Sequence, residues 1–195
     1  AVTTVSFNAA NIAAQDFNNV YIVDSKFVSI GAATIVKATA QFIEDNPNTN
    51  PEEIIAFVED IRERNHMVFL PRTLLYLKAG GRVSNLAFYG ANLLKIHPSI
   101  ILKNGYLVSG GKYRGSFDRC LKKMINDFFG SYNIDPDTVL IVGAPDVEEN
   151  QKEMIYDLLR EKGVQNTMWM YAGAVISSHG GPGAIGIAGI EKAVN

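Results

Sequence analysis

The chain has 195 residues, of which 47% are hydrophobic and 19% charged, a composition typical of globular proteins that leaves room for one large or two small domains. The formal net charge is −2 and the lysines and arginines are scattered along the chain, which argues against a basic surface for nucleic acid. The single cysteine, Cys120, has no second cysteine with which to form a disulfide or a zinc site, so we interpret it as a packed thiol in a reducing compartment.

The sequence contains no segment typical of a membrane span or a secretion signal. No apolar run approaches the roughly 18 residues that cross a bilayer, and no charged-then-apolar stretch opens the chain. We therefore expect a cytoplasmic protein. Because residues 3–6 lead directly into a helical pattern with no preceding strand, and the first residue is Ala1 rather than Met, we also expect a truncated beginning.

The first part of the chain predicts an αβ unit followed by a second helix. Residues 8–14 are helix-like, and residues 20–24 form a short β-rich run after the turn-forming pair Asn18-Asn19. The second helix is expected from Ser29 to Asp45. It ends at a polar stretch, residues 46–49, which cannot continue the apolar pattern.

This polar break is the predicted domain boundary. Residues 1–48 would form the remainder of an N-terminal α/β domain, and residues 49–195 a C-terminal α/β domain. The segment Asn50-Pro51-Glu52-Glu53 supplies an N-cap, a proline at the first helical position and an N3 carboxylate, so a third helix begins there.

Alternating strands and helices are predicted for the rest of the chain from hydrophobic periodicity and turn residues. The predicted strands are residues 66–70, 99–103, 106–108, 138–142, 168–171 and 174–176, and the predicted helices are residues 73–78, 117–129, 146–162 and 183–194. The second and third of these strands are joined by Asn104-Gly105, which is typical of a β-hairpin with a type I′ turn.

Glycines recur at a spacing of three in the predicted terminal helix, at Gly183, Gly186 and Gly189. Each costs a helix about 0.8–1 kcal/mol relative to alanine, so a reason for tolerating them is needed. Close packing of the helix on a sheet is one reason. The other is that a face of small residues leaves room for a long apolar ligand, and the two are compatible.

His179 precedes this element on a glycine-rich turn. A lone histidine is more often structural than functional. The surrounding Gly180, Gly181 and Gly183 favour function, because an open backbone with available amides is the material of an anion site. We therefore predict that His179 and these backbone groups lie near the head group of a ligand.

Two arginines are candidates for binding a carboxylate. Arg114 lies between the hairpin and a helix, where an arginine is held near the end of an element. Arg82 follows Gly80-Gly81, whose glycines are already explained as the end of a helix. For both, a solvated surface arginine is the common alternative, and that alternative weighs more for Arg82.

Four segments together resemble the DegV family, in the order in which the family has them. The closing segment is His179-Gly180-Gly181-Pro182-Gly183-Ala184-Ile185-Gly186; the others are Tyr21–Lys26 with Ser29 and Gly31, Thr73–Ser84, and Gly111-Lys112-Tyr113-Arg114-Gly115. Any one match alone would be weak, but four that span most of the chain are specific.

The resemblance implies a two-domain α/β protein, here with a truncated first domain and a second domain that contains a β-hairpin. Such proteins hold one long-chain fatty acid in an apolar tunnel and, in bacteria, present it to a separate fatty acid kinase. The family's carboxylate contacts match His179 and Arg114, and Thr4 replaces a serine that supplies a hydroxyl. No cofactor and no metal are implied, and a homodimer would be one way to cover apolar surface left by the truncation.

Other readings of the same residues involve catalysis or no ligand. His179 would act covalently if the chain were a phosphotransfer subunit similar to those of dihydroxyacetone kinase, but no Walker-type lysine loop and no compact carboxylate pair for magnesium are present. A hydrolase triad of Ser25, His179 and Asp24 lacks a nucleophile elbow, and adjacent residues on a strand point to opposite sides. A ligand-free interaction module is the third reading, and the expected tunnel argues against it.

Overall fold

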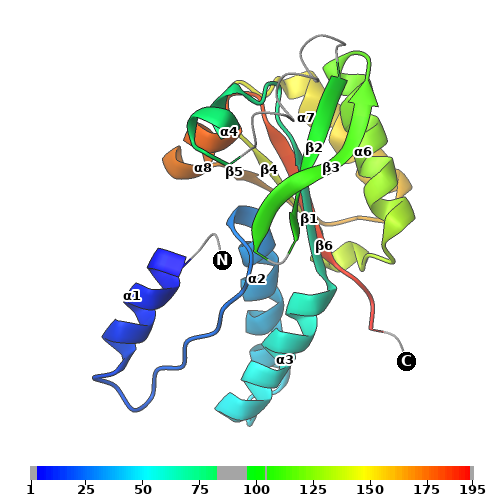
Figure 1. Cartoon of the computed structure of the whole chain (residues 1–195). Helices are drawn as coiled ribbons and strands as arrows, with labels where there is room; N and C mark the ends of the chain where they lie inside the picture. Colours follow the sequence, from blue (N-terminus) through cyan, green and yellow to red (C-terminus); the bar gives the residue numbers. More distant parts are fainter. Residues whose placement is uncertain (1–3, 83–95, 104, 194–195) are drawn as a thin grey trace.

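A six-stranded mixed sheet organises the protein (Figure 1). The computed structural model describes residues 4–82, 96–103 and 105–193. The strands are β1 (Asn65–Leu70), β2 (Ile96–Lys103), β3 (Tyr106–Arg114), β4 (Leu140–Gly143), β5 (Met168–Tyr171) and β6 (Ile185–Ile190). Their order across the sheet is β3-β2-β1-β6-β4-β5, and all neighbours are antiparallel except β4 and β5.

Helices cover both faces of this sheet. In the described part of the chain the helices are α1 (Thr4–Ala14), α2 (Ser29–Asp45), α3 (Pro51–Arg64), α4 (Leu75–Ala79), α6 (Phe117–Ser131), α7 (Glu149–Glu161) and α8 (Ala174–Gly180), with a 3₁₀ turn at Pro136–Thr138. Helices α6 and α7 lie on one face, whereas α2 packs against β1, β4 and β6 on the other and α3 packs on α2 (Figure 1). The observed architecture is therefore α/β, as predicted.

The alternation of side chains along the central strands assigns them to two separate cores. In β6, Ile185 and Ile187 pack with α6 and α7, while Ala188 packs with Ile30 of α2. In β4, Ile141 belongs to the first core and its neighbours belong to the second, as the two-residue repeat of a strand requires. The central strands are thus buried on both faces of the sheet.

Local sequence signals account for the starts of α3 and α6. At α3, Asn50 Oδ1 accepts from the Glu53 amide at 2.9 Å and Glu53 Oε2 accepts from the Asn50 amide at 3.0 Å, which completes the predicted capping box. At α6, the Ser116 side chain accepts from the Arg119 amide, and the buried face of the helix includes Cys120, which is fully buried. Burial raises the pKa of the Cys120 thiol, in keeping with an unreactive packed cysteine.

Several predicted elements are confirmed. Helix α2 has the predicted bounds, and the strands β1, β4 and β5 and the helices α4, α6 and α7 lie within a few residues of their predicted ranges. The hairpin of β2 and β3 is present, and Gly105 has the left-handed φ of 76° that its turn requires. Asn104 lies outside the described residues. The boundary between residues 48 and 49 falls in the loop between α2 and α3, and the division into domains stays a prediction.

Three predicted elements are wrong. Residues 183–194 were expected to form a helix, but they contain β6, which is fully buried and pairs on both sides, with β1 and β4. Residues 174–176 were expected to form a strand, but they begin α8, which packs against α4. Residues 20–24 were expected to form a strand, but they form a loop before α2 and do not join the six-stranded sheet.

Candidate functional site

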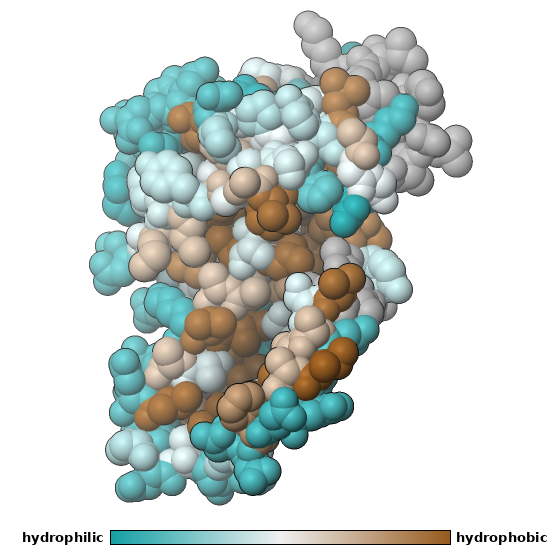
Figure 2. Space-filling model, turned by 90° about the vertical axis from the view of Figure 1, so that its left-hand side faces the viewer, coloured by the Kyte–Doolittle hydropathy of each residue, from teal (hydrophilic) through white to brown (hydrophobic). Residues whose placement is uncertain are grey.

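A cavity of about 280 Å³ lies on the α2 face of the sheet, between the strands and the pair of helices α4 and α8. This is close to the lower end of the usual size range for small-molecule pockets, about 300–1,000 Å³. Its lining is mainly apolar. Figure 2 views the molecule from the side of α1, α4 and α8, and hydrophobic surface gathers across the middle of that face.

The floor of the cavity is formed by the three central strands. β1 contributes Met67 and Phe69, β4 contributes Val142, and β6 contributes Gly186. A Cβ atom at Gly186 would lie 3.0 Å from Phe69 Cβ and 3.2 Å from Val142 Cγ1, so no larger residue fits between these side chains without displacing them. The glycine is therefore explained by close packing within the sheet, at the bottom of the cavity.

Helices α4 and α8 form the upper wall. Leu77 of α4 and Val175, Ile176 and His179 of α8 line this wall, and α4 and α8 lie against each other (Figure 1). Val175 is 72% exposed although it lines the cavity, so this wall reaches the surface of the protein. The apolar space is thus open to solvent on the side of α8.

Two polar side chains in addition to His179 reach the cavity from the N-terminal part of the chain. Ser6 of α1 and Ser29, the first residue of α2, both line it, together with Val28. Ser29 has a φ of 52°, an uncommon value for a residue other than glycine, so its position depends on the preceding loop. These two serines were not predicted as site residues, although Ser29 belongs to one of the four segments from which the resemblance was argued.

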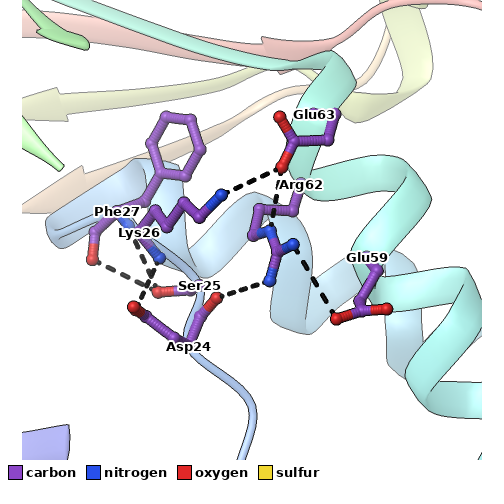
Figure 3. A network of polar contacts seen from close by, with 7 residues as sticks. All are labelled: Asp24, Ser25, Lys26, Phe27, Glu59, Arg62 and Glu63. Atoms are coloured by element: carbon purple, nitrogen blue, oxygen red, sulfur yellow. Dashed lines mark hydrogen bonds and ion pairs between the residues drawn. The ribbon is translucent and has the colours of Figure 1, made fainter. Parts of the chain in front are cut away.

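The loop before Ser29 is held by charged groups of α3 (Figure 3). Arg62 Nη1 donates to the carbonyl oxygen of Asp24 at 3.1 Å, and Lys26 Nζ lies 3.2 Å from Glu63 Oε1. Within the loop, the Lys26 amide donates to Asp24 Oδ1 at 2.9 Å. Hydrogen bonds from Lys26 and Arg62 lower the pKa of Glu63, so this carboxylate stays charged and keeps both contacts at neutral pH. These contacts of Arg62 and Glu63, here called the clamp, hold the loop that precedes Val28 and Ser29 in the cavity lining.

His179 is the titratable residue that α8 brings to the cavity wall. Its Nδ1 atom is buried and has no hydrogen-bond partner among the described residues. An unsatisfied buried polar atom costs about 1–3 kcal/mol, so such an atom in a native structure calls for an explanation. On one side this atom lies against Gly80, where an added Cβ atom would be 2.2 Å away.

The glycines of the closing segment have different surroundings. Gly180 lines the cavity. Gly181 and Gly183 do not; they adopt positive φ values of 80° and 68°, and the side chains of Tyr76 and Arg72 occupy the space beside them. The structure therefore places one of the three predicted backbone positions at the cavity and gives the other two a role in packing the loop.

The two arginines differ in position. Arg82 lines the cavity, and its Nη1 donates to the carbonyl oxygen of Gly80. Arg114 is the last residue of β3, pairs with Ile96 of β2, is exposed, and is not among the residues that line the cavity. Thr4 is the first residue of α1, and its side chain lies outside the described residues. Of the predicted head-group residues, the structure places His179 at the cavity.

Two general properties of the described part of the chain bear on the site. In residues 4–82, 96–103 and 105–193, no group of three His, Cys, Asp or Glu side chains is arranged to hold a metal ion. Within the same ranges, no helix combines the length and the apolar character needed to cross a membrane.

Comparisons with known proteins agree with the architecture. Residues 3–192 match the family model described as "Uncharacterised protein, DegV family". The chain is 28% identical over 190 residues to a DegV domain-containing protein of Clostridium acetobutylicum, covering 95% of this chain and 66% of that protein. For Protein DegV of Bacillus subtilis the identity is 28% over 188 residues, with coverages of 94% and 65%. The chain thus spans slightly less than two thirds of these relatives.

Solved structures show the same fold. A DegV family protein from Eubacterium eligens, loaded with heptadecanoic acid, has a TM-score of 0.82 and 20% identity, covering 97% of this chain and 68% of its own. A fatty-acid-binding DegV family protein from Thermus thermophilus has a TM-score of 0.80 and 25% identity, with coverages of 96% and 66%. Since the family model covers nearly all of the sequence, this chain belongs to the DegV family.

Proposed function

We propose that this chain binds a long-chain fatty acid, with the hydrocarbon tail in the apolar cavity and the carboxylate beside His179. The observation that carries the proposal is the cavity itself, an apolar space over the central strands with His179 in its wall. The fatty-acid-binding relative from Thermus thermophilus, which shares the fold at 25% identity, supports it.

The energetics of such a ligand suit the lining. Each CH₂ group moved from water to an apolar wall contributes about 0.8 kcal/mol, so the tail would provide most of the affinity. A carboxylate near the same cavity is costly unless it is paired and hydrogen-bonded. An imidazole, a guanidinium and hydroxyl groups are suitable partners, and His179, Arg82, Ser6 and Ser29 bring these groups to the lining.

We also propose that Arg114 and the Thr4 hydroxyl contribute to the carboxylate site, as the resemblance implies. Of the two arginines, Arg82 is the one that lines the cavity. The two assignments predict different effects of single arginine substitutions on fatty-acid binding. One arginine is enough to pair with the carboxylate in the proposed complex.

A further part of the proposal is that the protein does not itself transform the ligand but presents its carboxylate to a separate fatty acid kinase. Two lining residues support access for such a partner, because Arg82 is exposed and Val175 is 72% exposed. A head group between them would lie near the surface while the tail stayed covered.

Mass spectrometry of lipid extracted from the natively purified chain tests the binding proposal. A stoichiometric, non-covalently held fatty acid is the expected result. Delipidated protein titrated with palmitic acid provides the second measurement, because it does not depend on the lipids of the expression host. Absence of both co-purified lipid and titratable binding would refute the proposal, and a covalent adduct on His179 would favour phosphotransfer instead.

A further inference from the structure

The glycine pair that ends α4 contains two residues with different physical reasons for being glycine. Gly81 has a φ of 68°, and nothing lies within 4 Å of the position of an added Cβ atom. Gly80 has an ordinary φ of −78° and ψ of 0°, which any residue can adopt. A helix stop explains Gly81, but conformational freedom does not explain Gly80.

The space beside Gly80 is filled by the ring of His179. A Cβ atom at Gly80 would lie 2.2 Å from His179 Nδ1 and 2.6 Å from Cε1. Real Cβ atoms do not approach other atoms so closely, so a side chain at position 80 and the observed ring position exclude each other. We infer that Gly80 is a positioning residue for His179, whose lack of a side chain lets the imidazole lie in the cavity wall.

The same contact belongs to an interlocked set between the α4 segment and the closing loop. Tyr76 lies beside Gly181, where an added Cβ would be 2.5 Å from its ring, and Arg72 lies beside Gly183, where the corresponding distance to Nε is 2.3 Å. Residues 72, 76 and 80 therefore meet residues 183, 181 and 179 in turn. In the first two pairs the glycine is on the loop, and in the third it is on the α4 side, where it leaves room for the ring.

Arg72 is held in this arrangement from a second direction. Its Nη2 donates to Gln151 Oε1 of α7 at 3.0 Å, and its guanidinium lies 4.3 Å from the centre of the Phe117 ring. Arg72, which packs against the loop after His179, is thus itself held in place by Gln151 and Phe117. The imidazole is the movable part of the contact, so an added methyl group at position 80 would displace the ring rather than the backbone.

The inference rests on the proposed function only in what it says about binding, and its structural part is tested without ligand. Urea unfolding of the wild type, Gly80→Ala, His179→Ala and the double variant forms a double-mutant cycle. Gly80→Ala should lower the unfolding midpoint in the wild-type background and leave it unchanged when His179 is already alanine. An equal fall in both backgrounds would overturn the inference, since the alanine would then act on something other than the ring.

Imidazole NMR signals provide a readout that a general loss of stability would not move. The chain has three histidines, so the His179 signals are assigned by their absence in His179→Ala. In folded Gly80→Ala these signals should shift while those of His66 and His97 stay in place. Gly130→Ala is the matched control, because nothing lies within 4 Å of an added Cβ there, and all three sets of signals should remain unchanged. Unshifted His179 signals in Gly80→Ala would refute the positioning role.

Palmitic acid titration of the same four proteins connects the position of the ring to binding. Gly80→Ala should weaken binding about as much as His179→Ala does, and the double variant should lose no more than either. If the wild type binds no palmitic acid, the proposed function fails while the unfolding cycle and the NMR signals still decide the relation between Gly80 and His179. Full palmitic acid affinity in Gly80→Ala, with His179→Ala impaired, would overturn the inference.

Discussion

The ring of Tyr76 lies against Gly181, at the point where a Cβ atom would come within 2.5 Å of Tyr76 Cδ2. Gly181 has φ 80° and ψ 164°, a region that is almost restricted to glycine. The backbone after α8 therefore depends on glycine twice, for its conformation and for the space that Tyr76 occupies.

Gly181→Ala should for these reasons lower the free energy of unfolding by at least about 2 kcal/mol. Chemical denaturation measures this change. Gly130→Ala, in a helix with open space around it, should instead change stability by no more than about 1 kcal/mol and in the stabilising direction. Similar effects of the two substitutions would show that the closing loop adapts to a side chain at position 181.

A buried polar cluster beneath α2 leads to a second prediction. Asn65 is 3% exposed; its Nδ2 donates to the Gly31 carbonyl oxygen at 2.7 Å and its Oδ1 accepts from Thr34 Oγ1 at 2.8 Å. Asn65→Ala removes both contacts inside the core and should cost about 2–3 kcal/mol of unfolding free energy. Asn150→Ala on the exposed surface of α7 is the control, expected within about 0.5 kcal/mol of the wild type. Equal stability of the two variants would contradict the role of this cluster.

The clamp on the loop before α2 should be visible in hydrogen exchange. Arg62→Ala removes the donor to the Asp24 carbonyl oxygen, so the amides of residues 24–29 should exchange faster than in the wild type. Arg160→Ala is a matched control, since Arg160 pairs with Asp157 on the exposed side of α7. Unaltered exchange of residues 24–29 in Arg62→Ala would mean that the Lys26–Glu63 contact and the hydrogen bonds within the loop hold it without Arg62.

The capping box at α3 predicts an acid-dependent contribution to stability. Hydrogen bonds from the Asn50 amide and the Thr49 hydroxyl lower the pKa of Glu53 from its ordinary value of 4.5. A lowered pKa in the folded state means that the stabilisation is fully present above pH 4.5 and is lost as the pH falls through the folded pKa.

A comparison of the wild type with Glu53→Gln tests whether the contribution of Glu53 to stability falls on acidification. The difference between their urea midpoints should be constant from pH 5.5 to 7 and should shrink as the pH is lowered from about 4.5 to 3. Glu52→Gln serves as the control because Glu52 precedes the capping position and makes no cap contact. A difference that grows on acidification would contradict the assignment.

How far the sequence predicts the fold is illustrated by α2 and β6. The bounds of α2 follow from local signals, an apolar periodic run and a polar stop, and they were predicted correctly. β6 has no such local signature, because Ile185-Gly186-Ile187-Ala188-Gly189-Ile190 is a short apolar run that periodicity alone cannot assign to a helix or a strand. What makes it a strand is pairing with β1 and β4, segments far away in the chain.

The spacing of the glycines led to the wrong prediction of a helix over residues 183–194, because spacing does not show the long-range pairing of β6. At a spacing of three, Gly186 and Gly189 would share a helix face, but in a strand they point to opposite sides. Gly186 lies beside Phe69 and Val142, and Gly189 lies beside Ile134. The positions of Ser6, Ser29 and Arg82 at the cavity are likewise set by long-range packing, which short motifs do not encode.

The two arginines provide the last prediction. Arg82 lines the cavity with His179, whereas Arg114 is exposed at the end of β3. A hydrogen bond to a charged group contributes about 1.5–3 kcal/mol, which corresponds to a loss of affinity of about 10- to 150-fold when it is removed. If Arg82 holds the carboxylate, Arg82→Ala should weaken palmitic acid binding by this factor, and Arg114→Ala should leave it within about threefold of the wild type. Titration of delipidated protein at pH 7.5 measures both. The reverse order would assign the guanidinium to Arg114 and would require the end of β3 to approach the cavity when the ligand binds.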